Sequence, residues 1–272
     1  MHPNVSINTL CFAPGSLAAQ VEMIARIRAR AVTPDLAQIL QPGVSQSAAL
    51  FRDAGLEVAA LTHRAFGFAT PEAIDAERER LIRTIEIAAT IAAPTIVMTT
   101  GGRSSHSWSD AAQRFAEAVA PCAQFARQGG IALGVEPTSH LYADASILHN
   151  LSDTTRVCRQ AGIGVTIDLF ACWVDADIEN AIFEAGKSTA LVQVSDYVPG
   201  DRALPCRAVP GDGTIPLDRL IPAMVESGYR GWFDLEIIGP RLTAEGEEPG
   251  LRRAGNTIGR ILTKAGLGAV DD

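Results

Sequence analysis

Four short apolar segments in the second half of the chain end in, or pass through, side chains that offer oxygen ligands. They are Leu133-Gly134-Val135-Glu136, Val165-Thr166-Ile167-Asp168, Val192-Gln193-Val194-Ser195-Asp196 and Phe233-Asp234-Leu235-Glu236. Runs of this kind are typical of buried strands in a parallel sheet. A single acidic residue at a strand end is often only a helix cap or an ion-pair partner, but four in succession favour a shared site.

Three carboxylates at the ends of strands in one sheet would repel one another in a cavity of low dielectric constant. Protons or cations must relieve this repulsion, and a divalent metal ion is the simplest solution. Carboxylate and amide oxygens are hard ligands, which favours Mn²⁺ or Mg²⁺ over zinc, with Co²⁺ able to substitute. We therefore expect Glu136, Asp168 and Glu236 to hold a divalent metal, and we expect no organic cofactor.

The elements that must position these residues alternate along the chain without any long linker. Eight strands are predicted: Val5–Leu10, Ala31–Thr33, Glu57–Thr62, Thr95–Thr99, Ile131–Glu136, Gly164–Asp168, Ala190–Ser195 and Trp232–Glu236. Helices are predicted at Ala18–Ala29, Glu72–Ala92, Ser109–Gln128, Leu151–Ala161, Ile178–Ala185, Leu217–Ser227 and Leu251–Ala265. Strand followed by helix eight times predicts a parallel sheet that closes into a barrel.

The fold class predicted is therefore α/β, with residues 1–272 forming a single (β/α)₈ TIM barrel. Glycines that suit left-handed helix ends support this segmentation, at Gly55, Gly129-Gly130, Gly162 and Gly228. A doubly wound sheet would explain the same alternation. However, Phe12-Ala13-Pro14-Gly15 follows the first strand where that fold needs a glycine-rich phosphate loop.

Composition excludes several classes of partner. The net charge of −8, without any long cluster of Lys and Arg, argues against nucleic acid. No apolar run is long enough to span a membrane, and the N-terminus does not resemble a signal peptide, so we expect a cytoplasmic protein with no membrane partner. The five scattered cysteines suggest reduced thiols and neither a disulfide framework nor a zinc knuckle.

The carboxylate pattern resembles the xylose isomerase-like barrel superfamily, and within it the sugar-phosphate isomerase/epimerase group. That group includes tagatose and psicose 3-epimerases and hydroxypyruvate isomerases, and the resemblance covers nearly the whole chain. Its motif is Glu on strand five, Asp on six, His or Gln on seven and Glu on eight. The resemblance places metal ligands at Glu136, Asp168, Gln193 and Glu236. It also implies a small-molecule substrate from carbohydrate metabolism and a homodimer or homotetramer.

The segment from Val192 to Pro216 is most similar to the hydroxypyruvate isomerase version, which also carries Gln on strand seven. In that family both Glu residues touch the metal and move a proton at the carbon beside the carbonyl. The resemblance thus makes Glu136 and Glu236 the catalytic pair. It also implies that an Arg after strand seven contacts the substrate, with Arg207 preferred over Arg202 because it precedes the Pro-Gly-Asp-Gly turn.

The chain departs from the family after strand six. Sugar-binding members commonly have a His three residues after the Asp, where this chain has Ala171. His63, His106 and His140, which follow other predicted strands, are candidates to replace it, with His63 first.

Asp196 has two possible roles. It either contacts the substrate or supports the residues that do, or it is only a turn residue. Four aromatic residues in predicted loops either line the pocket or pack against neighbouring side chains. Together with the missing His, they suggest a substrate that is less polar than a free sugar. They are Phe66, Phe68, Trp108 and Trp173.

Two other functions remain open from the sequence. The same site could serve a lyase or dehydratase, because an enolate that can be reprotonated can also expel a β-leaving group. Alternatively, the chain could be a degenerate barrel that only binds a ligand. A metal-dependent repair endonuclease is disfavoured, because that chemistry uses more His ligands and a basic surface.

Overall fold

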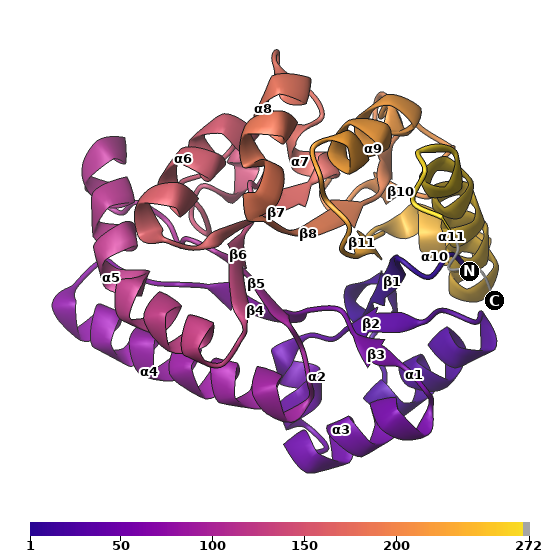
Figure 1. Ribbon diagram of the computed structural model, residues 1–272, viewed down its shortest axis with the longest axis horizontal. Helices are drawn as coiled ribbons and strands as arrows, with labels where there is room; N and C mark the ends of the chain where they lie inside the picture. Colours follow the sequence, from indigo (N-terminus) through magenta and orange to yellow (C-terminus); the bar gives the residue numbers. More distant parts are fainter. Residues whose placement is uncertain (269–272) are drawn as a thin grey trace.

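The computed structural model describes residues 1–268 as a (β/α)₈ barrel, which confirms the predicted fold class. The strands of the barrel are β1 (Val5–Asn8), β2 (Ala31–Thr33), β3 (Glu57–Val58), β4 (Leu61–Ala65), β5 (Thr95–Thr99), β6 (Ala132–Val135), β7 (Gly164–Asp168), β8 (Thr189–Val194) and β11 (Phe233–Leu235). They pair in parallel in the order β3-β2-β1-β11-β8-β7-β6-β5-β4. Figure 1 shows these strands at the centre of a ring of helices, with the N-terminus beside α11.

Seven of the helices that surround the barrel lie close to their predicted positions, whereas four others were not predicted. The helices are α1 (Leu17–Arg26), α2 (Leu36–Leu40), α3 (Val44–Asp53), α4 (Pro71–Thr90), α5 (Trp108–Gln128), α6 (Leu151–Ala161), α7 (Leu169–Cys172), α8 (Ile178–Ala185), α9 (Leu217–Glu226), α10 (Pro240–Glu245) and α11 (Glu247–Lys264). Those that were not predicted are α2, α3, α7 and α10. Side-chain caps define several starts; Thr70, for example, accepts a hydrogen bond from the Ala73 amide. Gly162 ends α6 with a φ of 67°, as a left-handed cap requires.

The third strand of the barrel differs from its prediction. Instead of one strand from Glu57 to Thr62, β3 pairs with β2 and β4 pairs with β5, with Ala59 and Ala60 between the two pieces. β4 continues to Ala65, and its register with β5 shifts between Thr62 and Arg64. Alternation alone did not predict this irregularity, because it depends on contacts with a neighbouring helix.

Apolar side chains fill the layer between strands and helices, while the barrel interior is mixed. Ala60, Val97 and Leu191 form a small separate apolar cluster, with Trp232 packed against it. Side chains two residues apart point to the same face of a strand, so Leu191 and Gln193 both face the interior. The apolar cluster therefore lies next to the polar residues that follow it along the strands.

Two further observations concern the sequence expectations on cysteines and membranes. All five cysteines are free and buried, which fits the absence of a predicted disulfide framework. Among residues 1–268, no helix combines the length and the apolar character needed to cross a bilayer.

Candidate active site

A cavity of about 400 Å³ opens among the carboxyl ends of the strands. This is the face at which barrels of this type build their active sites. Its walls include Glu136, Asp168, Glu236 and Arg207, and its remaining lining is largely apolar. Those other lining residues include Leu10, Val97, Met98, Tyr142, Phe170, Leu204, Pro205 and Ile238.

The three predicted carboxylates meet in this cavity. Glu136 directly follows β6, Asp168 ends β7 and Glu236 directly follows β11. Each offers an oxygen that lies within 4.8 Å of the oxygens offered by the other two. Asp168 also caps the short helix α7 by accepting a hydrogen bond from the Phe170 amide at 3.1 Å. The alternation of strands and helices thus predicted this convergence correctly.

Burial and mutual repulsion raise the pKa values of two members of this cluster, Glu136 and Glu236. Burial is the main cause that raises the pKa of Glu136 well above its usual range, and the charges of Glu236 and Asp168 add to it. Burial also raises the pKa of Glu236 to about 7, although the charge of Arg207 opposes the shift. Carboxyl groups that ionise near neutral pH can take up and release protons during a reaction.

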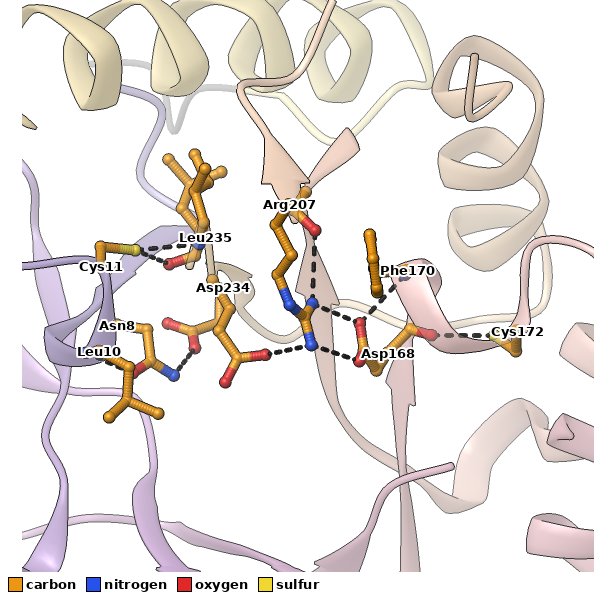
Figure 2. A network of polar contacts seen from close by, with 12 residues as sticks. Asn8, Leu10, Cys11, Asp168, Phe170, Cys172, Arg207, Asp234 and Leu235 are labelled. Atoms are coloured by element: carbon orange, nitrogen blue, oxygen red, sulfur yellow. Dashed lines mark hydrogen bonds and ion pairs between the residues drawn. The ribbon is translucent and has the colours of Figure 1, made fainter. Parts of the chain in front are cut away.

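Arg207 is the cation nearest to the cluster. Its Nη1 and Nη2 donate to the two carboxylate oxygens of Asp168 at 2.9 and 2.7 Å, and Nη2 lies 3.0 Å from Glu236. Nη1 also lies 3.3 Å from the Ser195 hydroxyl, and the guanidinium stacks 4.7 Å from the centroid of the Phe170 ring. Figure 2 shows the side chain between Asp168 and the segment around Leu235. Sequence reasoning preferred this arginine, and the structure places it in the cavity.

The donor set fits a hard divalent cation. Gln193 is 1% exposed, and its Oε1 has no hydrogen-bond partner among the described residues. Oε2 of Glu136 and Oε2 of Glu236 also have no hydrogen-bond partner among the described residues. Oε2 of Glu236 lies near Arg207, but without hydrogen-bond geometry. Buried oxygens without donors are costly unless a cation or a water binds them. Glu136, Asp168, Gln193 and Glu236 are therefore the residues that could hold a metal.

Another buried carboxylate, that of Asp234, holds in place the strand that ends just before Glu236. It accepts hydrogen bonds from Ser6 at 2.6 Å, Thr33 at 2.7 Å and Asn8 at 2.9 Å. Figure 2 shows the contact between Asp234 and Asn8. Burial raises the pKa of Asp234 to about 6, and the three hydrogen bonds limit the shift. Asp234 thus ties β11 to β1 and β2 inside the barrel.

His63, the first choice to replace the missing histidine, lies outside the cavity. It is fully buried within β4, and its Nδ1 is 2.9 Å from the Thr84 hydroxyl of α4. Burial, with a contribution from Arg80, lowers the pKa of its imidazole to about 3. Within β4, which continues past its predicted end, His63 contacts α4, whereas its neighbours Thr62 and Arg64 line the cavity.

Asp196 supports the turn that leads away from Arg207. Its carboxylate accepts hydrogen bonds from the amides of Tyr197 at 2.8 Å, Gly211 and Gly213 at 2.9 Å, and Ile215 at 3.0 Å. It pairs through β9 (Asp196–Tyr197) with β10 (Arg207–Ala208). Of the two roles that the sequence left open, the structure places Asp196 in the turn.

The other predicted substrate contacts also lie elsewhere. Arg202, His106, His140 and Trp173 are all described, and none of these four lines the cavity. His140 and Arg202 are exposed, and Trp173 packs against Tyr197 with ring centroids 6.2 Å apart. The loop aromatics Phe66 and Phe68 are buried against Phe115, and Trp108 donates to the Ile147 carbonyl, so these three pack ordinarily.

The sequence reasoning overlooked one charged residue that lines the cavity, Arg64. It has a φ of 85°, although it is not glycine, and it stands at the register shift of β4. Nothing in the sequence indicates that Arg64 lines a cavity. Its neighbour His63 belongs to a residue type that is more common in active sites.

Comparisons with known proteins agree with this fold. The sequence model of the family described as "Xylose isomerase-like TIM barrel" matches residues 20–256. Protein SMc04130 from Sinorhizobium meliloti 1021 is 25% identical, with 96% of this chain and 98% of that chain covered and a TM-score of 0.82. No curated protein matches the sequence.

Two more distant structures share the fold. The IOLI protein, solved with a bound zinc atom, is 14% identical, with 97% of this chain and 99% of that chain covered and a TM-score of 0.84. D-psicose 3-epimerase, solved in the presence of D-fructose, is 15% identical, with 99% and 100% covered and a TM-score of 0.77. At these identities the likeness extends to the fold alone.

Proposed function

Because the chain belongs to the xylose isomerase-like TIM barrel family, we propose that it is a divalent-metal-dependent isomerase or epimerase. The substrate would be a small hydroxy-ketone, keto-sugar or sugar derivative, and the reaction would transfer a proton at the carbon beside its carbonyl. The observation that carries the proposal is the convergence of Glu136, Asp168 and Glu236 in the lining of the cavity. The similar fold of D-psicose 3-epimerase supports it.

Glu136 and Glu236 would be the proton-transferring groups. When bound, a divalent ion supplies Lewis acidity that stabilises the negative charge developing on a carbonyl oxygen as the adjacent carbon loses its proton. Burial raises the pKa of Glu136, and it raises that of Glu236 to about 7. A carboxyl group with a raised pKa can hold a proton and act as the acid, while its ionised partner acts as the base. Using both groups on opposite faces gives epimerisation; returning the proton to the neighbouring carbon gives isomerisation.

The other members of the site would bind and orient. Asp168 and Gln193 complete the proposed ligand set, and Arg207 holds Asp168 in place through two hydrogen bonds. Mn²⁺ and Mg²⁺ are the metals we propose, because carboxylate and amide oxygens suit hard cations. The zinc bound to the IOLI protein makes zinc the necessary comparison.

Exchange with solvent deuterium tests the proposal directly. The purified protein is loaded with Mn²⁺, Mg²⁺, Co²⁺ or Zn²⁺ and mixed in D₂O with a panel of hydroxy-ketones and keto-sugars. NMR should show deuterium entering the carbon beside the carbonyl, and Glu136→Gln or Glu236→Gln should lower the rate by about 100-fold or more. Glu226→Gln, an exposed glutamate at the end of α9, is the matched control and should exchange at the wild-type rate.

The same experiment separates the alternatives. Full exchange in Glu236→Gln with metal bound would disprove the two-glutamate scheme. Loss of a β-substituent from the ketone would identify a lyase instead. Absence of both metal binding and exchange would favour a barrel that only binds its ligand.

The partners and location stay predictions. We propose a small-molecule substrate, a homodimer or homotetramer, and a cytoplasmic location. Light scattering coupled to size-exclusion chromatography measures the assembly directly.

A further inference from the structure

Two polar side chains of β4 extend into the cavity apart from the carboxylate cluster. Thr62 and Arg64 both line the cavity, whereas His63 between them contacts Thr84 in the helix layer. Thr62 is 9% exposed, and its hydroxyl has no hydrogen-bond partner among the described residues. A buried hydroxyl without a partner costs free energy, which a ligand in the cavity can recover.

The backbone of β4 is held in an unusual conformation that sends Arg64 into the cavity. Its φ of 85° is unfavourable for a residue with a side chain, and the pairing with β5 shifts register at this point. Arg80 of α4 stabilises the distortion from the other side. Its guanidinium donates to the His63 carbonyl at 3.2 Å and also to the Ala65 carbonyl. The carbonyls on both sides of Arg64 are thus fixed by one side chain.

The guanidinium of Arg64 pairs with one carboxylate and keeps further N–H donors for a ligand. Its Nη2 lies 2.7 Å from Oδ2 of Asp35, whose side chain is 5% exposed. The other oxygen of Asp35 caps α2 by accepting from the Ala37 amide at 2.9 Å. Within residues 1–268, Asp35 is the only ion-pair partner of Arg64. Since a guanidinium has five N–H donors, several remain for a ligand.

The cavity offers few positive charges to an anion. Arg64 and Arg207 are its only cationic side chains among the described residues, and Arg207 is already bound to Asp168 and Glu236. Arg64 is 62% exposed, so it stands at the solvent-facing side of the site, although its charge still acts on Glu236. A planar guanidinium and a hydroxyl without a partner, both lining one cavity from the same strand, are donors that suit the two oxygens of a carboxylate.

We propose that Arg64 and Thr62 form a subsite for a carboxylate group of the substrate, and that Asp35 positions Arg64. The substrate would then be a carbonyl compound that carries a carboxylate at a distance from the reacting carbon, and a neutral sugar would lack the group that this subsite binds. This inference rests on the proposed function and adds the charge of the substrate to it.

Binding of two matched ligands tests the subsite without any turnover. Isothermal titration of the Mn²⁺-loaded protein compares 5-hydroxy-4-oxopentanoate with its amide, which differ only in charge at the end distant from the hydroxy-ketone. We expect the acid to bind wild type about tenfold more tightly than the amide, because charge-assisted hydrogen bonds are the stronger ones. Added salt should reduce the ratio, since Arg64 is partly exposed.

Variants assign the preference to Arg64. Arg64→Gln should bind acid and amide equally, Arg64→Lys should keep part of the preference, and Asp35→Asn should lower the ratio without changing the affinity for the amide. Arg83→Gln is the matched control, because Arg83 is 63% exposed and pairs only with Glu79 within the described residues. This control should keep the wild-type ratio. Circular dichroism and Mn²⁺ affinity verify that the variants remain folded with the metal site intact.

The proposal is overturned if wild type binds acid and amide equally, or if the preference for the acid persists in Arg64→Gln. Neither result bears on deuterium exchange, which tests the proton-transfer function itself. Conversely, a charge preference lost in Arg64→Gln would support the subsite even in a barrel that showed no exchange.

Discussion

Arg207 binds both carboxylate oxygens of Asp168, with hydrogen bonds of 2.9 and 2.7 Å, while its Nη2 lies 3.0 Å from Glu236. The arginine side chain is 14% exposed, so this is a buried ion pair. The attraction of the carboxylates outweighs the effect of burial and raises the pKa of Arg207 above its ordinary value, which keeps it charged. The cluster therefore contains one permanent cation whether or not a metal is bound.

Removal of that cation should destabilise the metal-free protein most. We expect Arg207→Gln to lower the free energy of unfolding by about 3–5 kcal/mol without metal, because it leaves buried carboxylates uncompensated. Saturating Mn²⁺ should reduce the loss, since a dication restores the charge balance. Urea unfolding with and without Mn²⁺ measures both values.

A surface arginine provides the comparison for this variant. Arg219→Gln removes an exposed ion pair with Glu179 and should cost less than about 1 kcal/mol in either condition. An equal loss for Arg207→Gln with and without Mn²⁺ would mean that the cluster does not bind the metal.

Metal affinity should depend on pH because the pKa values of two proposed ligands, Glu136 and Glu236, are raised. The pKa of Glu236 is about 7, and burial raises that of Glu136 as well. Below pH 7 a metal must displace at least one proton, so we expect the Mn²⁺ affinity to rise by at least about tenfold per pH unit, and the slope to decrease above pH 7 as Glu236 ionises. Titrations between pH 5.5 and 8 measure this dependence. A flat profile would contradict the raised pKa values, and Glu236→Gln should make the profile less steep.

His63 should affect stability and leave catalysis unchanged. Its pKa is about 3 in the folded protein against an ordinary 6.5, so the unfolded chain takes up a proton as the pH falls below 6.5 and the folded chain does not. The stability from His63 is therefore complete above pH 6.5 and falls by about 1.4 kcal/mol per pH unit towards pH 3. In His63→Gln this part of the pH dependence should vanish.

Urea unfolding at several pH values from 5 to 8 compares the two proteins. The difference in unfolding free energy between wild type and His63→Gln should decrease as the pH is lowered. A constant difference, or a large loss of deuterium exchange in the variant, would instead restore His63 to the site.

The sequence predicted the parts of the site that depend on strand alternation. Glu136, Asp168 and Glu236 each end an apolar run, and parallel strands bring such ends together, so their convergence followed from pattern alone. Arg64 did not follow, because its direction depends on a register shift supported by Arg80 from another element. Sequence patterns carry no information on such a tertiary contact.

The role of Asp196 was left open for a related reason. Its partners are backbone amides up to 19 residues further along the chain, and an amide has no sequence signature. Arg207 could be preferred over Arg202 because of the turn that follows it, and the structure shows that Asp196 holds that turn together.

Loss of Asp196 should therefore disturb the loop that supports Arg207. Asp196→Ala leaves four backbone amides without their acceptor, and a hydrogen bond to a charged group contributes about 1.5–3 kcal/mol. We expect a loss of stability of at least about 3 kcal/mol, together with faster hydrogen exchange at Gly211 and Gly213. Asp196→Asn, which keeps one acceptor oxygen, should lose less. If Asp196→Ala unfolded like wild type and lost only substrate affinity, Asp196 would be a substrate contact after all.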